Sequence, residues 1–282
     1  MGVKGLSKLL RPYSINIGNL QGFKGKDLAI DTSIYLYKFK YKTEKNFFIK
    51  RFIDQLCMFK DYNITPLYVF DGVPPKEKQE TLEKRSMQKN KEGAIRITGE
   101  DVRNLKKTFD LLKVKYFSPK NVEGEKYCSY LVKSGKADAV LSNDFDTLVF
   151  GSKKLITWTN EGYSLYDLEY ILNKLEITYE HLVDLCIACG TDYNPKGIKN
   201  FGPSKSLKKV KACGKIESWG DAKGDLDQEA ENFLNKIRDI FFSEPEEECL
   251  QVVDVENKAN KENFEKFLIS LDLNIQEDKI LK

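Results

Sequence analysis

Apolar residues group along the chain in two ways, as short unbroken runs and as longer runs with the spacing of one helical face. A short unbroken run predicts a buried strand, and the helical spacing predicts an amphipathic helix. Strands are predicted at 26–31, 65–71, 113–117, 139–141 and 154–158. Helices are predicted at 6–10, 35–41, 46–62, 101–112, 122–132, 166–175 and 182–189. Because helices alternate with strands, the pattern predicts an α/β fold with a central, mainly parallel sheet flanked by helices.

Three of the predicted strands lead into aspartates, namely Asp31, Asp71 and the pair Asp144 and Asp146. The carboxyl ends of parallel strands are where such sheets bind ligands. On an extended backbone residues 144 and 146 share a face, so their carboxylates repel each other. A hard divalent cation such as Mg²⁺ would explain the pair. An Asp-rich turn explains this single stretch equally well.

Three further carboxylates lie at predicted helix ends. Glu123 and Glu125 open a helix, where the helix dipole tolerates negative charge. Asp192 follows Gly190, a residue suited to ending a helix. Seven carboxylates cannot share one cleft without cations. Two Mg²⁺ ions about 4 Å apart, holding the attacking and leaving oxygens, are an established solution for phosphodiester hydrolysis.

Lysines gather where the sequence suits nucleic-acid binding. Residues 196–215 contain seven lysines and no acidic residue, with Gly197 and Gly202-Pro203 before the helical part. Such an entry presents N–H groups and positive charge to phosphate, which favours unspecific binding of a DNA backbone. A solvated surface helix is the simpler alternative. In the helix at 35–41 aromatic residues alternate with lysines, which suits base stacking or a half-buried face.

Residues 76–96 are highly charged and poor in large apolar groups, so they cannot contribute much to a core. This segment should project into solvent or onto a ligand. Lys78 and Arg85 are seven residues apart, which places both on one face of a helix. Fixed cations on that face would stabilise charge that develops on a scissile phosphate.

The composition describes a globular protein, with 282 residues, 41% hydrophobic and 32% charged. No apolar run has the length of a membrane span, and the first residues lack a signal sequence. A soluble, intracellular protein without a membrane partner is therefore expected. The six cysteines should be reduced thiols. The spacing of Cys186 and Cys189 lacks the further ligands that a structural zinc site needs.

The net charge of +3 hides an asymmetry. Residues 1–216 carry 38 Lys and Arg against 25 Asp and Glu, a net charge of +13, whereas residues 217–282 carry 8 against 18, a net charge of −10. The first part has the basic excess typical of a phosphate-backbone binder. The acidic part could equally be a solvated helical face.

Several short motifs follow one another in order: M-G-V-K-G-L-S-K-L-L at the start, A-I-D at 29–31, V-F-D-G-V-P-P at 69–75, K-R-S at 84–86, E-G-E at 123–125, L-V-K-S-G-K at 131–136, N-D-F-D-T-L-V-F-G at 143–151 and V-D-L-C-I-A-C-G-T-D-Y at 183–193. With these motifs the chain resembles, from Met1 to about residue 216, the structure-specific 5′ nuclease family that includes flap endonuclease and its XPG-like relatives. The resemblance implies a PIN-like nuclease core, a helical arch at 76–110 and a helix-two-turn-helix DNA-binding motif at 197–215.

The resemblance also implies residue roles. Its metal ligands are Asp31, Asp71, Glu123, Glu125, Asp144, Asp146 and Asp192. Its catalytic residues are Lys78, Arg85, Asp144 and Asp146. Its DNA-binding residues are Gly2, Tyr37, Lys78, Arg85, Lys199, Gly202, Ser204, Lys205, Lys208 and Lys209.

Within this set, Lys78 and Arg85 polarise the scissile phosphate and Tyr37 stacks on the base beside the cut. Removal of Met1 places the amine of Gly2 near the metals. The cofactors are two Mg²⁺, for which Mn²⁺ can substitute, and one K⁺ at the helix-two-turn-helix.

Four departures from the family pattern stand out. Asn200 replaces a Gly, which is tolerable because Asn enters the left-handed region more readily than most residues. Gly124 replaces a common Ala, and the segment 76–110 is shorter than in many relatives. No Q-x-x-aliphatic-x-x-aromatic-aromatic peptide occurs near Lys282, so binding to a sliding clamp is not supported.

The sequence thus predicts a monomeric, Mg²⁺-dependent flap endonuclease with 5′→3′ exonuclease activity in DNA replication and repair, in the nucleus or wherever DNA is replicated. Its partners are DNA with a 5′ flap and nicked or gapped duplex. Three regions are expected: an N-terminal nuclease region at 1–122, an internal nuclease region at 123–216 and an acidic helical extension at 217–282 packed on the core. The alternatives are a mainly exonucleolytic or PIN-like ribonuclease relative and a non-catalytic DNA-binding scaffold.

Overall fold

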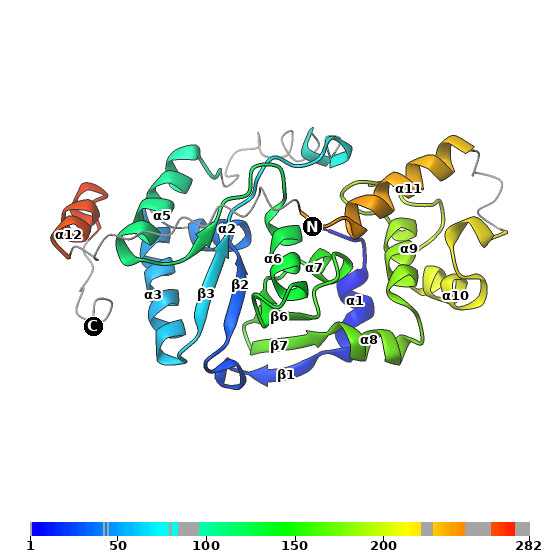
Figure 1. The fold of residues 1–282 in the computed structure, drawn as a ribbon, viewed down its shortest axis with the longest axis horizontal. Coiled ribbons are helices and arrows are strands. Elements are labelled where there is room, and N and C mark those ends of the chain that lie inside the picture. The colour runs from blue at the N-terminus through cyan, green and yellow to red at the C-terminus, as the bar shows by residue number, and fades with distance from the viewer. Residues whose placement is uncertain are drawn as a thin grey trace.

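A seven-stranded sheet forms the centre of the protein (Figure 1). The computed structural model describes residues 2–41, 43, 45–78, 81–83, 96–220, 228–245 and 261–273. The strands are β1 (Ile15–Gly18), β2 (Asp27–Asp31), β3 (Thr65–Val69), β4 (Tyr116–Phe117), β5 (Ala139–Leu141), β6 (Lys154–Thr159) and β7 (Gly162–Asp167). Their order across the sheet is β1-β7-β6-β5-β2-β3-β4. The five strands from β2 to β6 pair in parallel, which confirms the predicted α/β fold.

The strand β7 pairs antiparallel with both β6 and β1, and neither β1 nor β7 was predicted. Both are partly exposed strands, so they lack the unbroken apolar run that marked the central strands. The helix predicted at 166–175 begins only at Leu168. Its N-cap is Asp167, whose side chain accepts the N–H of Tyr170 at 3.0 Å, so β7 continues up to that cap.

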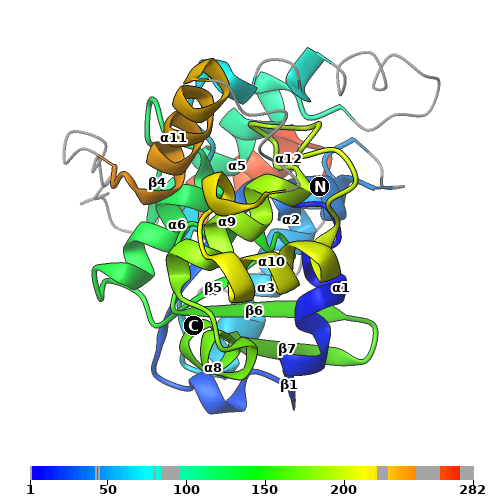
Figure 2. The ribbon, with the colours of Figure 1, turned by 90° about the vertical axis from the view of Figure 1, so that its right-hand side faces the viewer.

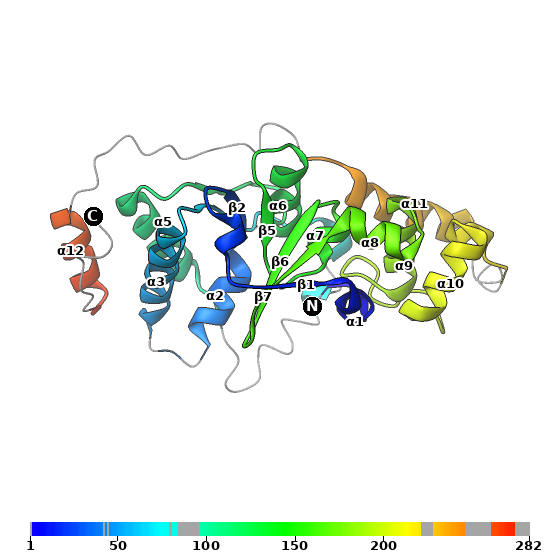
Figure 3. The same cartoon turned by 90° about the horizontal axis from the view of Figure 1, so that it is seen from below.

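Helices cover both faces of the sheet (Figure 3). The α-helices of the described residues are α1 (Leu6–Leu10), α2 (Thr32–Lys40), α3 (Phe47–Asp61), α5 (Gly99–Leu112), α6 (Gly124–Lys133), α7 (Asp146–Val149), α8 (Leu168–Leu175), α9 (Tyr179–Cys189), α10 (Pro203–Cys213), α11 (Gln228–Phe242) and α12 (Lys261–Ser270). Within the described ranges none of them is long and apolar enough to cross a membrane.

Each face of the sheet has its own hydrophobic core, because neighbouring strand residues point to opposite faces. Ala29 belongs to a core with residues of α1, α6, α7, α9 and α11, whereas Leu28 and Ile30 belong to a core with residues of α2, α3, α5 and α12. The helices α11 and α12 therefore pack on different cores, at opposite ends of the molecule (Figure 1). The described cysteines are free thiols, as expected.

Candidate active site

Four of the predicted ligands lie at the carboxyl ends of strands that are neighbours in the sheet, namely Asp31, Asp71, Asp144 and Asp146. Asp31 is the last residue of β2 and caps α2, and its Oδ1 accepts the N–H of Ile34 at 3.4 Å. Asp71 follows β3 by two residues. Since β5, β2 and β3 are parallel neighbours, their carboxyl ends bring these side chains to one edge of the sheet.

The pair Asp144 and Asp146 is brought together by a turn rather than by an extended strand. The strand β5 ends at Leu141, and Asp146 is the first residue of α7. Oδ1 of Asp144 accepts the N–H of Asp146 at 3.0 Å. The prediction that both side chains share one strand face was therefore wrong in its geometry, although both are buried in the same cluster.

Asp146 is almost completely buried, with 1% of its surface exposed. Its Oδ1 accepts the N–H of Val3 at 2.8 Å. Its Oδ2 is buried and has no hydrogen-bond partner among the described residues. A buried oxygen of this kind is costly to leave unsatisfied, so its surroundings suit an electropositive ligand.

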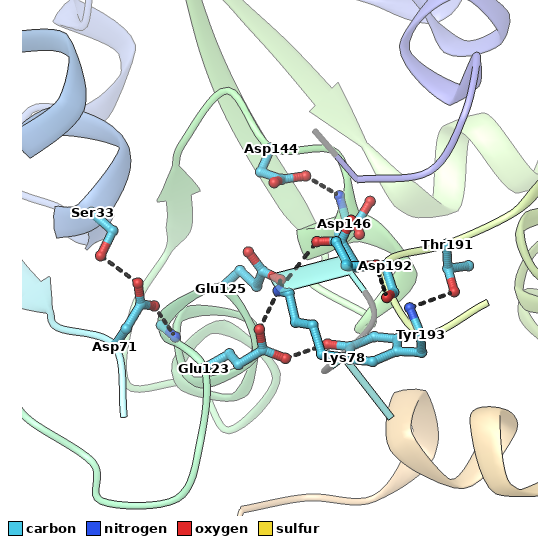
Figure 4. A network of polar contacts seen from close by, with 12 residues as sticks. Ser33, Asp71, Lys78, Glu123, Glu125, Asp144, Asp146, Thr191, Asp192 and Tyr193 are labelled. Atoms are coloured by element: carbon cyan, nitrogen blue, oxygen red, sulfur yellow. Dashed lines mark hydrogen bonds and ion pairs between the residues drawn. The ribbon is translucent and has the colours of Figure 1, made fainter. Parts of the chain in front are cut away.

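Lys78 lies inside the carboxylate cluster (Figure 4). Its Nζ forms ion pairs with Glu123, with Glu125 at 3.4 Å and with Asp192 at 3.2 Å. Only 5% of Lys78 is exposed. It ends a short 3₁₀ turn, Lys76–Lys78, so this part of the charged segment faces the site rather than solvent. Arg85 lies outside the described residues, as does most of 79–95.

Tyr193 also reaches the cluster, although the sequence predicted no role for it. Its hydroxyl donates a hydrogen bond of 2.5 Å to Oε2 of Glu123. It directly follows Asp192 at the end of the G-T-D-Y motif. Its place in this motif is the only feature of the sequence that could have indicated a role for Tyr193. Its partner Glu123 is 70 residues away in the chain, so no local pattern links the two.

Two glycines allow the backbone to approach the aspartates closely. At Gly2, where φ is 79°, an added Cβ would clash with Asp146 and lie 2.7 Å from Oδ1 of Asp144. At Gly124 an added Cβ would lie 2.7 Å from Oδ1 of Asp71, which accepts the Gly124 N–H at 2.8 Å. An alanine at position 124 would therefore require Asp71 to move.

Two family models match the chain. The XPG N-terminal domain matches residues 1–92, and the XPG I-region matches residues 113–192. Together they cover well over half of the sequence. The chain belongs to the XPG nuclease family. It is 29% identical to Flap endonuclease 1 of Drosophila willistoni, over 95% of this chain and 80% of that protein. It is also 29% identical to Flap endonuclease 1 of Saccharolobus solfataricus, over 77% of this chain and 72% of that protein.

Solved structures of XPG-family proteins have the same fold. Flap endonuclease-1 from Methanococcus jannaschii superposes with a TM-score of 0.74, at 26% identity, over 94% of this chain and 92% of that one. The catalytic core of Rad2 in complex with a DNA substrate gives a TM-score of 0.77, at 20% identity, over 95% of both chains. This likeness confirms the PIN-like nuclease fold.

The charges at this XPG-family site perturb one another strongly. Burial, followed by the charges of Asp71 and Asp144, raises the pKa of Asp31 to about 7. Burial also raises the pKa of Asp144, and it raises the pKa of Glu125 and Asp146 well above the ordinary value. Burial alone would lower the pKa of Lys78, but the nearby carboxylates outweigh it and raise this pKa. The cluster thus holds more negative charge than Lys78 neutralises.

The donor set fits a hard divalent cation, which XPG-family nucleases generally use. All seven predicted ligands are carboxylates, the preferred ligands of Mg²⁺, and Asp146 Oδ2 is an orphaned buried acceptor. As the side chains stand, however, no group of three or more His, Cys, Asp or Glu in the described part of the chain is arranged to hold a metal. Three of the seven, Glu123, Glu125 and Asp192, pair instead with the ammonium group of Lys78.

Of the predicted DNA-binding residues, Gly2 and Lys78 belong to this cluster, whereas Tyr37 and the residues of α10 and the turn before it lie outside it. Helix α10 packs against α9 and α1 (Figure 2). The turn before it contains Asn200 with φ 64°, which confirms that Asn here takes the left-handed conformation. Gly202 is the N-cap of α10. Among the predicted contacts near α10, the exposed side chains are Lys199, Ser204, Lys205 and Lys208, and Lys209 is half-buried. Tyr37 is half-buried on α2, which begins directly after Asp31.

Proposed function

We propose that this protein is a Mg²⁺-dependent flap endonuclease, which cuts 5′ flaps where single-stranded DNA meets duplex, with accompanying 5′→3′ exonuclease activity. The observation that carries the proposal is the cluster at the sheet edge. The cluster holds seven carboxylates separated by up to 161 positions in the chain, three of them paired with one Lys, in an XPG-family protein similar over most of its length to flap endonuclease 1. A non-catalytic scaffold has no use for so much negative charge near DNA phosphates.

Each part of the cluster has a task under this proposal. Asp31, Asp71, Glu123, Glu125, Asp144, Asp146 and Asp192 would hold two Mg²⁺. When bound, these ions supply an activated water as nucleophile and neutralise the leaving oxygen. The backbone of Gly2, which already lies against Asp144 and Asp146, brings the start of the chain next to the reacting phosphate.

In this mechanism Lys78 would occupy two positions in turn. In the described structure its ammonium group pairs with the carboxylates. Lys78 would leave these carboxylates to pair with the scissile phosphate, together with Arg85. There it stabilises the negative charge that grows in the transition state.

Duplex binding would fall to α10 and the turn before it. The N–H groups at Gly202 and Ser204 and the lysines at 199, 205, 208 and 209 offer positive charge to a phosphate backbone without reading bases. A K⁺ ion would complete this helix-two-turn-helix, and Tyr37 would stack on the base beside the cut. We expect the protein to act as a monomer, in the nucleus or wherever DNA is replicated.

The test is incubation of the protein with a 5′-flap duplex that carries a label at the 5′ end, with Mg²⁺ and with a chelator. The proposal expects release of an intact labelled flap oligonucleotide from the junction, only when Mg²⁺ is present. A bulky block added to the flap after binding should not stop the cut, if the chain at 76–110 lets the flap pass. Mononucleotides alone, with flaps ignored, would favour a pure exonuclease. Binding without any cleavage would favour the scaffold.

A further inference from the structure

Glu123 is held on two sides by groups of different charge (Figure 4). Its Oε1 pairs with the ammonium group of Lys78. Its Oε2 accepts the hydrogen bond of 2.5 Å from the neutral hydroxyl of Tyr193. The Lys78 contact has to break before Lys78 can meet a phosphate. The Tyr193 contact can persist, because a neutral donor leaves the full negative charge on Glu123.

Tyr193 is itself fixed at both its backbone and its ring. Oγ1 of Thr191 accepts the N–H of Tyr193 at 3.2 Å and that of Asn194 at 3.1 Å. The ring is 2% exposed. It packs edge-on against Phe241, with centroids 5.5 Å apart and the planes at 77°, and against Phe150 at 6.4 Å and 78°. The packing of the Tyr193 ring therefore holds its hydroxyl toward Glu123.

Phe241 belongs to α11, a helix of the acidic region at residues 217–282. Two sets of contacts tie the C-terminal half of this helix to the rest of the protein. Nζ of Lys126 donates to the Ile240 carbonyl oxygen and to Ser243 Oγ, each at 2.8 Å. Two residues before Ile240, the Arg238 guanidinium pairs with Asp184 at 2.7 Å and with Glu217. An ion pair of this kind, between partly or fully buried groups, restricts sliding of α11 over α9.

We infer that Tyr193 is a positioning residue that orients Glu123 for the metal, and that α11 holds Tyr193 in place through Phe241. This inference rests on the proposed function, since it takes Glu123 as a metal ligand. A hydrogen bond to one oxygen of a ligating carboxylate fixes the direction of its other oxygen. Loss of such a partner typically weakens metal binding by 10-fold to 100-fold, so we expect an effect of ~10-fold here. The acidic region thereby gains a role in the active site without contributing a ligand.

The decisive variant is Tyr193→Phe, which keeps the ring and removes only the hydroxyl. The readout is the affinity of the DNA-free protein for Mn²⁺, measured by titration calorimetry. We expect about tenfold weaker binding. The matched control is Tyr68→Phe, which also removes a buried hydrogen bond, from the Tyr68 hydroxyl to Gln55 Oε1 at 2.8 Å, but in the core on the other face of the sheet. The control should bind Mn²⁺ like the wild type.

A second variant tests the contribution of α11. Phe241→Leu leaves the Tyr193 hydroxyl in place but removes the ring that supports it, so Mn²⁺ binding should weaken in the same direction and by less than in Tyr193→Phe. Thermal unfolding shows whether each variant is folded. If Tyr193→Phe fails to fold, Phe241→Leu decides the matter alone. Wild-type Mn²⁺ affinity in a folded Tyr193→Phe, or in Phe241→Leu in that case, would overturn the inference.

Failure of the inference can be told apart from failure of the proposed function. If the wild-type protein binds no Mn²⁺ and releases no flap, the metal role of Glu123 is wrong and the inference goes with it. If the wild type binds Mn²⁺ and cuts flaps while Tyr193→Phe binds Mn²⁺ equally well, only the positioning role is wrong.

Discussion

The carboxylate cluster at the sheet edge and the lysine-rich helix α10 are both strongly charged, but the chain builds them in opposite ways. The carboxylates come from several elements and most are buried, with exposed fractions of 1% at Asp146 and 9% at Asp144, although Asp71 is exposed and Glu125 is half-buried. The lysines come from one continuous segment, and Lys205 and Lys208 are exposed. The first site concentrates charge, and the second spreads it over a surface.

This difference determines how the two sites should respond to change. Buried charges in a low dielectric act on one another strongly, which is why burial and neighbouring carboxylates raise the pKa of Asp31 to about 7. Exposed charges are screened over roughly 10 Å in ordinary salt. Single substitutions in the cluster should therefore have large, interdependent effects, whereas those on α10 should have small effects that add.

The largest effect is expected for Asp144→Asn and Asp146→Asn. Either change should lower the rate of flap cleavage by several orders of magnitude, because metal ions supply both the nucleophile and leaving-group stabilisation. Duplex binding should stay the same or tighten, since a negative charge near phosphate is lost. Single-turnover cleavage and fluorescence anisotropy measure the two quantities.

The matched control for these two variants is Asp138→Asn. Asp138 directly precedes β5 at the opposite end of the strand, where it pairs with Lys26 at 3.0 Å. This variant should cut at nearly the wild-type rate. Retained cleavage in Asp144→Asn and Asp146→Asn would show that these residues are not metal ligands.

The next effect concerns Lys78, the cation at the centre of the cluster. Lys78→Ala should slow single-turnover cleavage by roughly 10²-fold to 10³-fold, the usual cost of losing one preorganised electrostatic group. It should also tighten Mn²⁺ binding in the absence of DNA, because Glu123, Glu125 and Asp192 lose their resident counter-charge. Lys76→Ala, an exposed change in the same turn, is the control. Weaker Mn²⁺ binding in Lys78→Ala would contradict this reading.

A smaller effect should appear in the pH dependence of the metal-free protein. The pKa of Asp31 is raised from 3.8 to about 7, so between these values the folded protein keeps a proton that the unfolded chain releases. Stability contributed at this site should therefore fall as pH rises through this window. In chelator, the midpoint of thermal unfolding should drop more between pH 5 and 8 in the wild type than in Asp31→Asn. Added Mg²⁺ should reduce this difference between the wild type and Asp31→Asn. An equal drop of the unfolding midpoint in the two proteins in chelator would contradict the prediction.

The sequence predicted the central sheet and its aspartates because both depend on local pattern. Unbroken apolar runs marked β2, β3 and β5, and their parallel arrangement then followed from the alternation with helices. Asn200 was also predicted from local rules, and its φ of 64° confirms them. The partly exposed strands β1 and β7 carried no such pattern and were missed.

The contacts inside the cluster could not be predicted, because they depend on tertiary structure. Lys78 was expected on a helical face that meets the scissile phosphate, but it ends a short 3₁₀ turn and pairs with carboxylates of the cluster. Tyr193 meets Glu123 across 70 positions of the chain. Asp144 and Asp146 were placed together correctly but for the wrong reason, since a turn rather than a strand joins them.

The smallest effect is expected on α10, where each lysine should act almost alone. Lys208 is exposed, so if it contacts a DNA phosphate, Lys208→Ala should lower the slope of log affinity against log salt by about 0.9 and weaken binding equally for all sequences. Lys211 is a matched control on the same helix, because its ammonium group already pairs with Glu176 at 2.5 Å. Lys211→Ala should change the slope less. Anisotropy titrations of one duplex at several salt concentrations give both slopes, and an unchanged slope in Lys208→Ala would make this face of α10 an ordinary solvated surface.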